Sequence, residues 1–175
     1  MLCDTFTARL RRGAGVARVD RLPYFAEQLV DALADIEQLV LVGAKEPVAF
    51  FAYPGKPGRC VDPNTEVVVL AHPHEDGLGA LEAVAAGFDS LATFVELSLP
   101  DQPTGRLDQW SIGAVIARLL PEDAVVSDEG ATNSLGANTA LMTSVPHDVL
   151  SLTGGSIGQG VPEARSEEHT SELQS

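Results

Sequence analysis

The amino-acid sequence predicts an α/β protein in which parallel strands alternate with helices, arranged as two successive α/β units. Short runs of Val and Leu recur along the chain and are typical of strands buried in parallel sheets. Between these runs, apolar residues recur at spacings of three and four, which is typical of amphipathic helices. Their alternation favours parallel sheets covered by helices over an all-helical or all-β fold.

The first unit follows an N-terminal segment, residues 1–18, that ends in a turn-like cluster of Arg and Gly. We predict a helix from about Tyr24 to Ala34, then strands at Leu39–Val42 and Glu66–Leu70. The intervening stretch Pro47–Gly58 holds three aromatic residues and three prolines, which predicts a packed, irregular loop that contacts either another domain or a cofactor. A further helix is marked by an apolar stripe at Leu78, Leu81, Val84, Ala85 and Phe88.

The second unit lies beyond a stretch, residues 96–106, that breaks both periodicities and predicts a linker. Strands are expected at Ala124–Val126 and Val149–Leu152, with a loop at Asp128–Ala131 and a helix at Ser134–Met142 between them. An earlier helix ends at Pro121, and its expected apolar stripe consists of Ile112, Val115, Ile116, Leu119 and Leu120.

The charge balance excludes some classes of partner. The chain has 25 acidic and 11 basic residues and a formal net charge of −14, which disfavours nucleic acid and anionic membrane surfaces. No apolar run approaches the roughly 20 residues of a membrane helix, and the N-terminus lacks a signal-peptide pattern. The two cysteines, Cys3 and Cys60, are far apart, so we expect reduced thiols in a cytoplasmic protein.

A glycine-rich loop, Leu152–Pro162, follows the last predicted strand. Backbone N–H groups at the start of a helix bind anions, and glycine lets a ligand approach the backbone closely. The loop matches neither the phosphate-binding loop that ends in Gly-Lys-Ser/Thr nor the GxGxxG fingerprint of dinucleotide sites. The residues alone therefore leave a structural turn and a cofactor site equally open.

Two loops together carry a family resemblance. Asp128–Thr132 and Gly154–Gly158 resemble the acidic loop and the Gly-Gly-x-hydrophobic-Gly loop of thiamine diphosphate (ThDP) enzymes related to acetolactate synthase and benzoylformate decarboxylase. Arg21–Phe25, Leu41–Lys45 and Pro47–Pro57 are similar to the acetolactate synthase large subunits of that family. The resemblance covers the chain except its last residues. It implies a central ThDP-enzyme domain at 1–95, a linker at 96–106, and the start of the diphosphate-binding domain at 107–164.

The resemblance also implies roles for individual residues. The Gly155 carbonyl would accept a hydrogen bond from the aminopyrimidine of the cofactor, and Ile157 would support its bent shape. Ala131 and Thr132 would offer a backbone N–H and a hydroxyl to the diphosphate, while Glu129 would order the loop rather than transfer protons. The implied cofactor-binding residues are Ala131, Thr132, Gly154, Gly155, Ser156 and Ile157.

By the same resemblance, the parent protein is a carboligase or decarboxylase that acts on a 2-oxo acid with ThDP and Mg²⁺, as a homodimer or homotetramer. The family's magnesium motif and pyrimidine-activating glutamate have no counterpart in these residues, so we expect no catalytic or metal-binding residue here and no turnover by the chain alone. FAD is bound by some relatives, and no residue here commits to it.

Several alternatives remain. Leu22 occupies the position where benzoylformate decarboxylases carry a catalytic histidine, and leucine cannot relay protons, which weakens that assignment within the family. A non-catalytic nucleotide- or FAD-binding module, or an interaction protein, would need no further cofactor motif. The histidines at positions 72, 74 and 147 match no family motif, and we expect them to lie in solvated loops.

The last residues, Arg165–Ser175, have no apolar periodicity. They read like the in-frame translation of a common short-read sequencing adapter, so we expect them to be an artefact rather than a natural polar tail. We also expect Met1 to be an internal methionine, because the family sequence continues upstream of it.

Overall fold

The computed structural model describes residues 1–52, 54–88 and 93–165. The chain divides into two compact units, the first made of Met1–Thr5 and Asp20–Leu91 and the second of Phe6–Val19 and Ala92–Ser175. The predicted division at residues 95 and 107 did not separate residues 6–19 from the first unit. The family names attached to the predicted domains remain predictions, and the tail beyond residue 165 lies outside the described residues.

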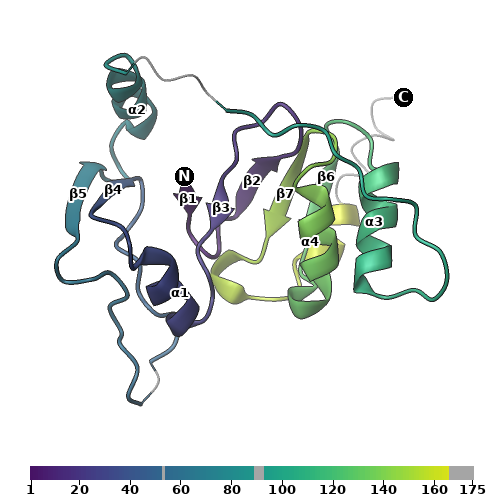
Figure 1. Cartoon of the computed structure of the whole chain (residues 1–175), viewed down its shortest axis with the longest axis horizontal. Helices are drawn as coiled ribbons and strands as arrows, with labels where there is room; N and C mark the ends of the chain where they lie inside the picture. The colour runs from purple at the N-terminus through teal and green to yellow at the C-terminus, as the bar shows by residue number, and fades with distance from the viewer. Residues whose placement is uncertain (53, 89–92, 166–175) are drawn as a thin grey trace. The chain divides into compact units, whose positions relative to one another are not determined.

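The first unit contains two small parallel sheets. One pairs β1 (Leu2–Cys3) with β3 (Asp20–Arg21), and the other pairs β4 (Gln38–Val42) with β5 (Glu66–Ala71). The second sheet confirms the two predicted parallel strands, and α1 (Ala26–Leu33) confirms the helix before them (Figure 1); β1 and β3 were not predicted. The core of the unit combines α1, β4, β5 and the irregular segment through Leu29, Leu33, Cys60 and Val61, with Leu39 and Val67 packed against them.

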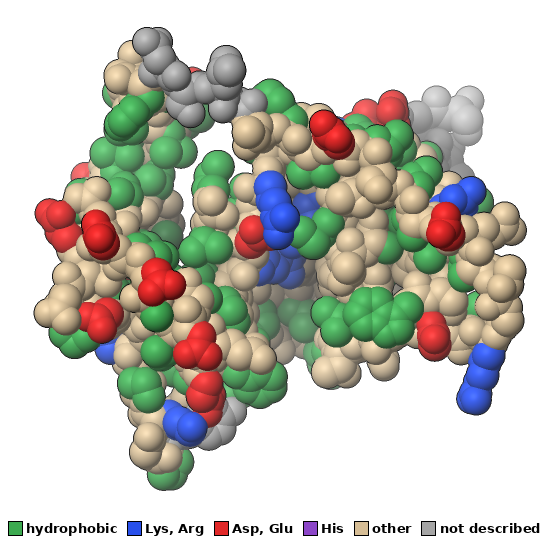
Figure 2. All heavy atoms as spheres, in the orientation of Figure 1, with side chains coloured by type: hydrophobic (Ala, Val, Ile, Leu, Met, Phe, Trp, Pro, Cys, Tyr) green, Lys and Arg blue, Asp and Glu red, His purple; other side chains and the backbone are tan. Residues whose placement is uncertain are grey.

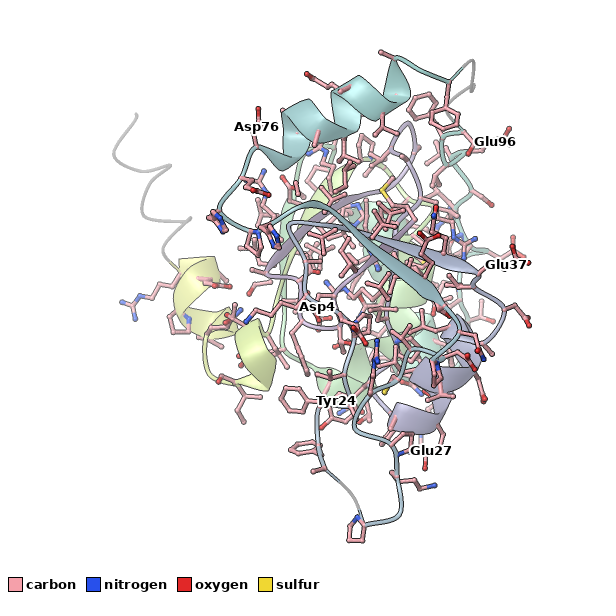
Figure 3. All side chains as sticks on the ribbon, turned by 90° about the vertical axis from the view of Figure 1, so that its left-hand side faces the viewer. Asp4, Tyr24, Glu27, Glu37, Asp76 and Glu96 are labelled. Carbon is pink, nitrogen blue, oxygen red and sulfur yellow. The ribbon has the colours of Figure 1, made fainter. Side chains whose placement is uncertain are left out.

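The segment between β4 and β5 is irregular, as predicted. Its described residues form neither a helix nor a strand, apart from an isolated antiparallel bridge between Val48 and Arg59. Phe50 and Phe51 pack edge to face, with ring centroids 4.7 Å apart. Tyr24, just before α1, contacts both rings at 5.7 and 5.9 Å (Tyr24 is labelled in Figure 3). All three side chains remain partly exposed.

Helix α2 (Gly77–Ala85) ends the first unit. Asp76 caps it by accepting a hydrogen bond from the Gly79 N–H at 2.9 Å (Figure 3). The periodicity predicts this helix correctly, but α2 has no buried residue, and Leu78 is 69% exposed. The predicted apolar stripe at positions 78–88 is thus not part of the core of the first unit.

The second unit is built on a mixed three-stranded sheet in the order β2–β7–β6. Strands β6 (Val125–Asp128) and β7 (His147–Ser151) are parallel, as predicted. The edge strand β2 (Arg9–Arg12) runs antiparallel to β7, and the sequence did not predict it in the N-terminal segment. It is held by Arg9, whose Nε and Nη2 donate to the two oxygens of Asp148 at 3.2 and 2.8 Å.

Helices α3 (Gln109–Leu119) and α4 (Leu135–Leu141) pack side by side next to this sheet (Figure 1). The buried face of α3 is formed by Gly113, Ala114 and Ala117. The predicted stripe was wrong as a core face, since Leu119 in it is 76% exposed. The reason is close backbone contact: a Cβ on Gly113 would lie 2.4 Å from the carbonyl oxygen of Gly136 in α4.

A second correction concerns His147, for which the sequence predicts a solvated loop. It is fully buried at the start of β7, and its Nδ1 lies 2.7 Å from the Val145 carbonyl oxygen. His72 and His74 are exposed, as expected.

Acidic side chains are spread over the face in Figure 2 rather than gathered. Among the helices described, none has the length and apolar character needed to cross a membrane.

Candidate functional site

The two loops singled out by the sequence lie at the same edge of the sheet in the second unit. β6 and β7 are adjacent and parallel, with Asp128 in register with Ser151, so their carboxyl ends coincide. The 3₁₀ turn η1 (Ala131–Ser134) follows β6, and the 3₁₀ turn η2 (Thr153–Gly155) follows β7. Ligands bind at such carboxyl ends in open α/β sheets.

The acidic loop after β6 is fixed by the carboxylate of Asp128. This group accepts hydrogen bonds from the Gly130 N–H at 3.0 Å, from the Asn138 side-chain amide at 2.8 Å and from the Ser134 hydroxyl. Ala131, which follows Gly130 in the sequence, adopts a left-handed conformation with φ of +48°. That conformation costs an alanine about 1–2 kcal/mol, and residues with such strained backbones cluster at functional sites.

The glycine loop after β7 depends on backbone conformations that favour glycine. Gly154, Gly155 and Gly158 have φ values of +60°, +77° and +104°. A Cβ on Gly154 or Gly158 would meet no atom within 4 Å, so close packing does not require glycine there. Glycine is favoured by the left-handed backbone conformation, and the space beside the chain is open. The helix that the loop is predicted to open starts at residue 160.

The predicted cofactor residues are all accessible. Ala131 and Thr132 in η1, and residues 154–157 of the glycine loop, are exposed. Ile157 is 78% exposed although it is an aliphatic side chain inside a run of small residues. An apolar side chain in that position contributes nothing to the core of the second unit.

Glu129 connects the two loops. Its Oε2 accepts hydrogen bonds from the backbone N–H groups of Gly158 at 2.8 Å and Gly160 at 2.9 Å. These bonds hold the pKa of Glu129 below its usual range, and the bond from Gly160 has the largest effect. The expectation that Glu129 orders the loop agrees with this geometry. The sequence did not reveal its partners, since they lie 29 and 31 positions away.

A second link joins the end of β6 to the helix after the glycine loop. The Ser127 hydroxyl donates to the Glu163 carboxylate at 2.7 Å. An open groove runs beside the two links, and none of the six predicted cofactor residues lines it. Its lining residues are Ser127, Asp128, Glu129, Gly130, Gly160, Val161, Ala164 and Arg165.

The residues of this unit fit ThDP only in part. For the diphosphate, the exposed turn η1 can offer the Ala131 N–H and the Thr132 hydroxyl; for the rest of the cofactor, the glycine loop can offer a carbonyl and the Ile157 side chain. Two carboxylates, of Asp128 and Glu129, lie beside them, so a bound diphosphate would need a cation. Over the described residues, no cluster of three or more His, Cys, Asp or Glu side chains could supply that metal's ligands.

A comparison with known proteins finds a clear relative of this chain. The chain is 46% identical over 166 residues to the Mycobacterium tuberculosis protein named "Putative acetolactate synthase large subunit IlvX". The match covers 93% of this chain and 32% of that protein, so the chain spans about a third of the length of its relative. No protein-family profile matches the chain.

Proposed function

We propose a function from the premise that the chain belongs to the acetolactate synthase-like family of ThDP enzymes. The second unit would form one wall of the ThDP site, with the two loops after β6 and β7 as its contact surfaces. The observation that carries the proposal is the meeting of these loops at one sheet edge, with Ile157 exposed on the glycine loop.

Four of the six predicted residues then have a task. The Ala131 N–H and the Thr132 hydroxyl would hold the diphosphate, and the strained backbone of Ala131 would aim its N–H outwards. Gly155 would accept a hydrogen bond from the aminopyrimidine. Ile157 would fill the inside of the cofactor's bend, where an apolar side chain costs nothing to the fold.

When bound, ThDP would supply the chemistry that removes carbon dioxide from a 2-oxo acid and leaves a carbon unit that either takes up a proton or adds to a second carbonyl group. The residues of this chain would bind and orient. Mg²⁺ would offset the repulsion between the diphosphate and the carboxylates of Asp128 and Glu129. The ligands of the Mg²⁺ would come from outside the described residues. A cytoplasmic location, an oligomeric parent enzyme and absence of turnover by the chain alone belong to the same proposal.

The test is a chimera in which residues 1–164 of this chain replace the matched segment of the M. tuberculosis relative. We expect the chimera to bind ThDP with Mg²⁺ and to release carbon dioxide from pyruvate, with the unmodified relative as the reference. Calorimetry and a decarboxylation assay measure the two properties. A folded chimera that binds no ThDP while the relative binds it would refute the proposal, and would favour a non-catalytic module.

A further inference from the structure

Glu129 makes a contact that joins the two proposed contact surfaces, and its geometry is specific. One oxygen, Oε2, accepts from two backbone N–H groups at 2.8 and 2.9 Å, those of Gly158 and Gly160. A single oxygen can accept two such bonds only if the two N–H groups converge on it. The carboxylate therefore determines the course of the backbone from residue 158 to residue 160.

The surroundings of Glu129 are built for this contact. Its own backbone is held on one side by Asp128, which accepts from Gly130, Ser134 and Asn138. On the other side, Gly160 is buried, and a Cβ there would lie 3.0 Å from Cγ and 3.1 Å from Cδ of Glu129. A larger residue at position 160 would therefore force the Glu129 side chain to shift by a few tenths of an ångström.

The contact lies between the two ends of the proposed site. Ile157 directly precedes Gly158, and Ala131 follows Glu129 by two positions. A fixed link between Glu129 and Gly158 therefore limits the separation between the diphosphate end and the aminopyrimidine end. Proton transfer is a poor role for this carboxylate, because both N–H donors stabilise its ionised form.

We propose that Glu129 is a positioning residue that sets the spacing between the two cofactor-contact loops. This inference rests on the proposed function. It predicts that the reach of the side chain matters more than its charge. Glutamine keeps an acceptor oxygen at the same distance, whereas aspartate keeps the charge but is one methylene group shorter. Glu129→Gln should therefore preserve the link and Glu129→Asp should break it.

The first measurement is amide hydrogen exchange by NMR on the full 175-residue chain. Glu129→Asp and Glu129→Ala should speed exchange at Gly158 and Gly160 by about tenfold, as expected for a lost hydrogen bond, and Glu129→Gln should leave it close to wild type. Exposed Glu122, in the turn before β6, provides matched controls as Glu122→Gln and Glu122→Asp. Full protection in Glu129→Asp, with circular dichroism showing a native fold, would overturn the inference.

The second measurement uses the chimera and separates the two proposals. We expect Glu129→Asp to weaken ThDP affinity about tenfold, and Glu129→Gln to keep both affinity and the pH profile of the rate. If the exchange pattern holds but no chimera binds ThDP, the proposed function fails and the link between the loops stands. If the chimera binds ThDP and Glu129→Asp binds it equally well, the positioning role fails while the function stands.

Discussion

Replacing Gly136 by alanine should force α3 and α4 apart. A Cβ at this position would lie 2.1 Å from the carbonyl oxygen of Gln109, where ordinary contact begins at 3.4 Å, so the backbones must separate by about 1.3 Å. Backbone atoms cannot escape by changing rotamer, so the cost lies at the upper end of the roughly 1–3 kcal/mol typical of overpacking. The higher helix propensity of alanine returns at most about 1 kcal/mol.

The expected net loss is about 2 kcal/mol, which lowers the unfolding temperature by about 4–8 °C in a protein of this size. Thermal unfolding followed by circular dichroism measures it. Gly58→Ala is the matched control, since a Cβ there would meet no atom within 4 Å and the change should stay within about 0.5 kcal/mol. An unchanged unfolding temperature in Gly136→Ala would show that the helices do not touch in this way. Because α4 follows η1 directly, ThDP affinity of the chimera should fall with stability.

Three further predictions concern single positions. Ala131→Gly should relieve the left-handed conformation and raise stability by up to about 1 kcal/mol in urea unfolding, and no gain would remove the argument from strain. Ile157→Ala should leave the unfolding temperature of the chain unchanged, because the side chain is 78% exposed, yet slow turnover by the chimera; unchanged turnover would remove Ile157 from the site. The hydrogen bonds from Arg9 lower the pKa of Asp148, so its contribution to stability is present above the unfolded-state pKa of about 3.9 and is lost as the pH falls through the lower folded-state value. In Asp148→Asn, the free energy of unfolding should therefore depend less on pH below about pH 4 than in the wild type. The same pH dependence in both proteins would mean that the ion pair is not formed.

The parts of the fold that could be predicted from the sequence are those whose signal is local. β4, β5 and β7 contain short apolar runs, and α1, α2 and α3 contain apolar residues at helical spacing, so the existence of these elements could be inferred from neighbouring residues. β2 could not be inferred in this way, because Arg9–Arg12 contains one apolar residue. Its stability comes from pairing with β7 and from Arg9 reaching Asp148, 139 positions along the chain.

The buried face of α3 was predicted wrongly for a related reason. Periodicity counts large apolar side chains, whereas this helix contacts its neighbour through Gly113 and two alanines. Small residues carry little hydrophobic signal but allow backbones to touch, and only the position of Gly136 in the partner helix reveals the contact. Similarly, the family motifs predicted where both loops of the site begin, but not that Glu129 of one loop bonds to Gly158 of the other.

The way the chain is threaded has a practical consequence for anyone who dissects this protein. The chain passes between the two units three times, because the segment Phe6–Val19 belongs to the second unit while the residues on both sides of it belong to the first. A truncation at the predicted linker would therefore remove β2 and leave β7 with an open hydrogen-bonding edge. An expression clone of the second unit alone should carry residues 6–19 joined ahead of residue 92 through a short flexible linker, so that this edge stays paired.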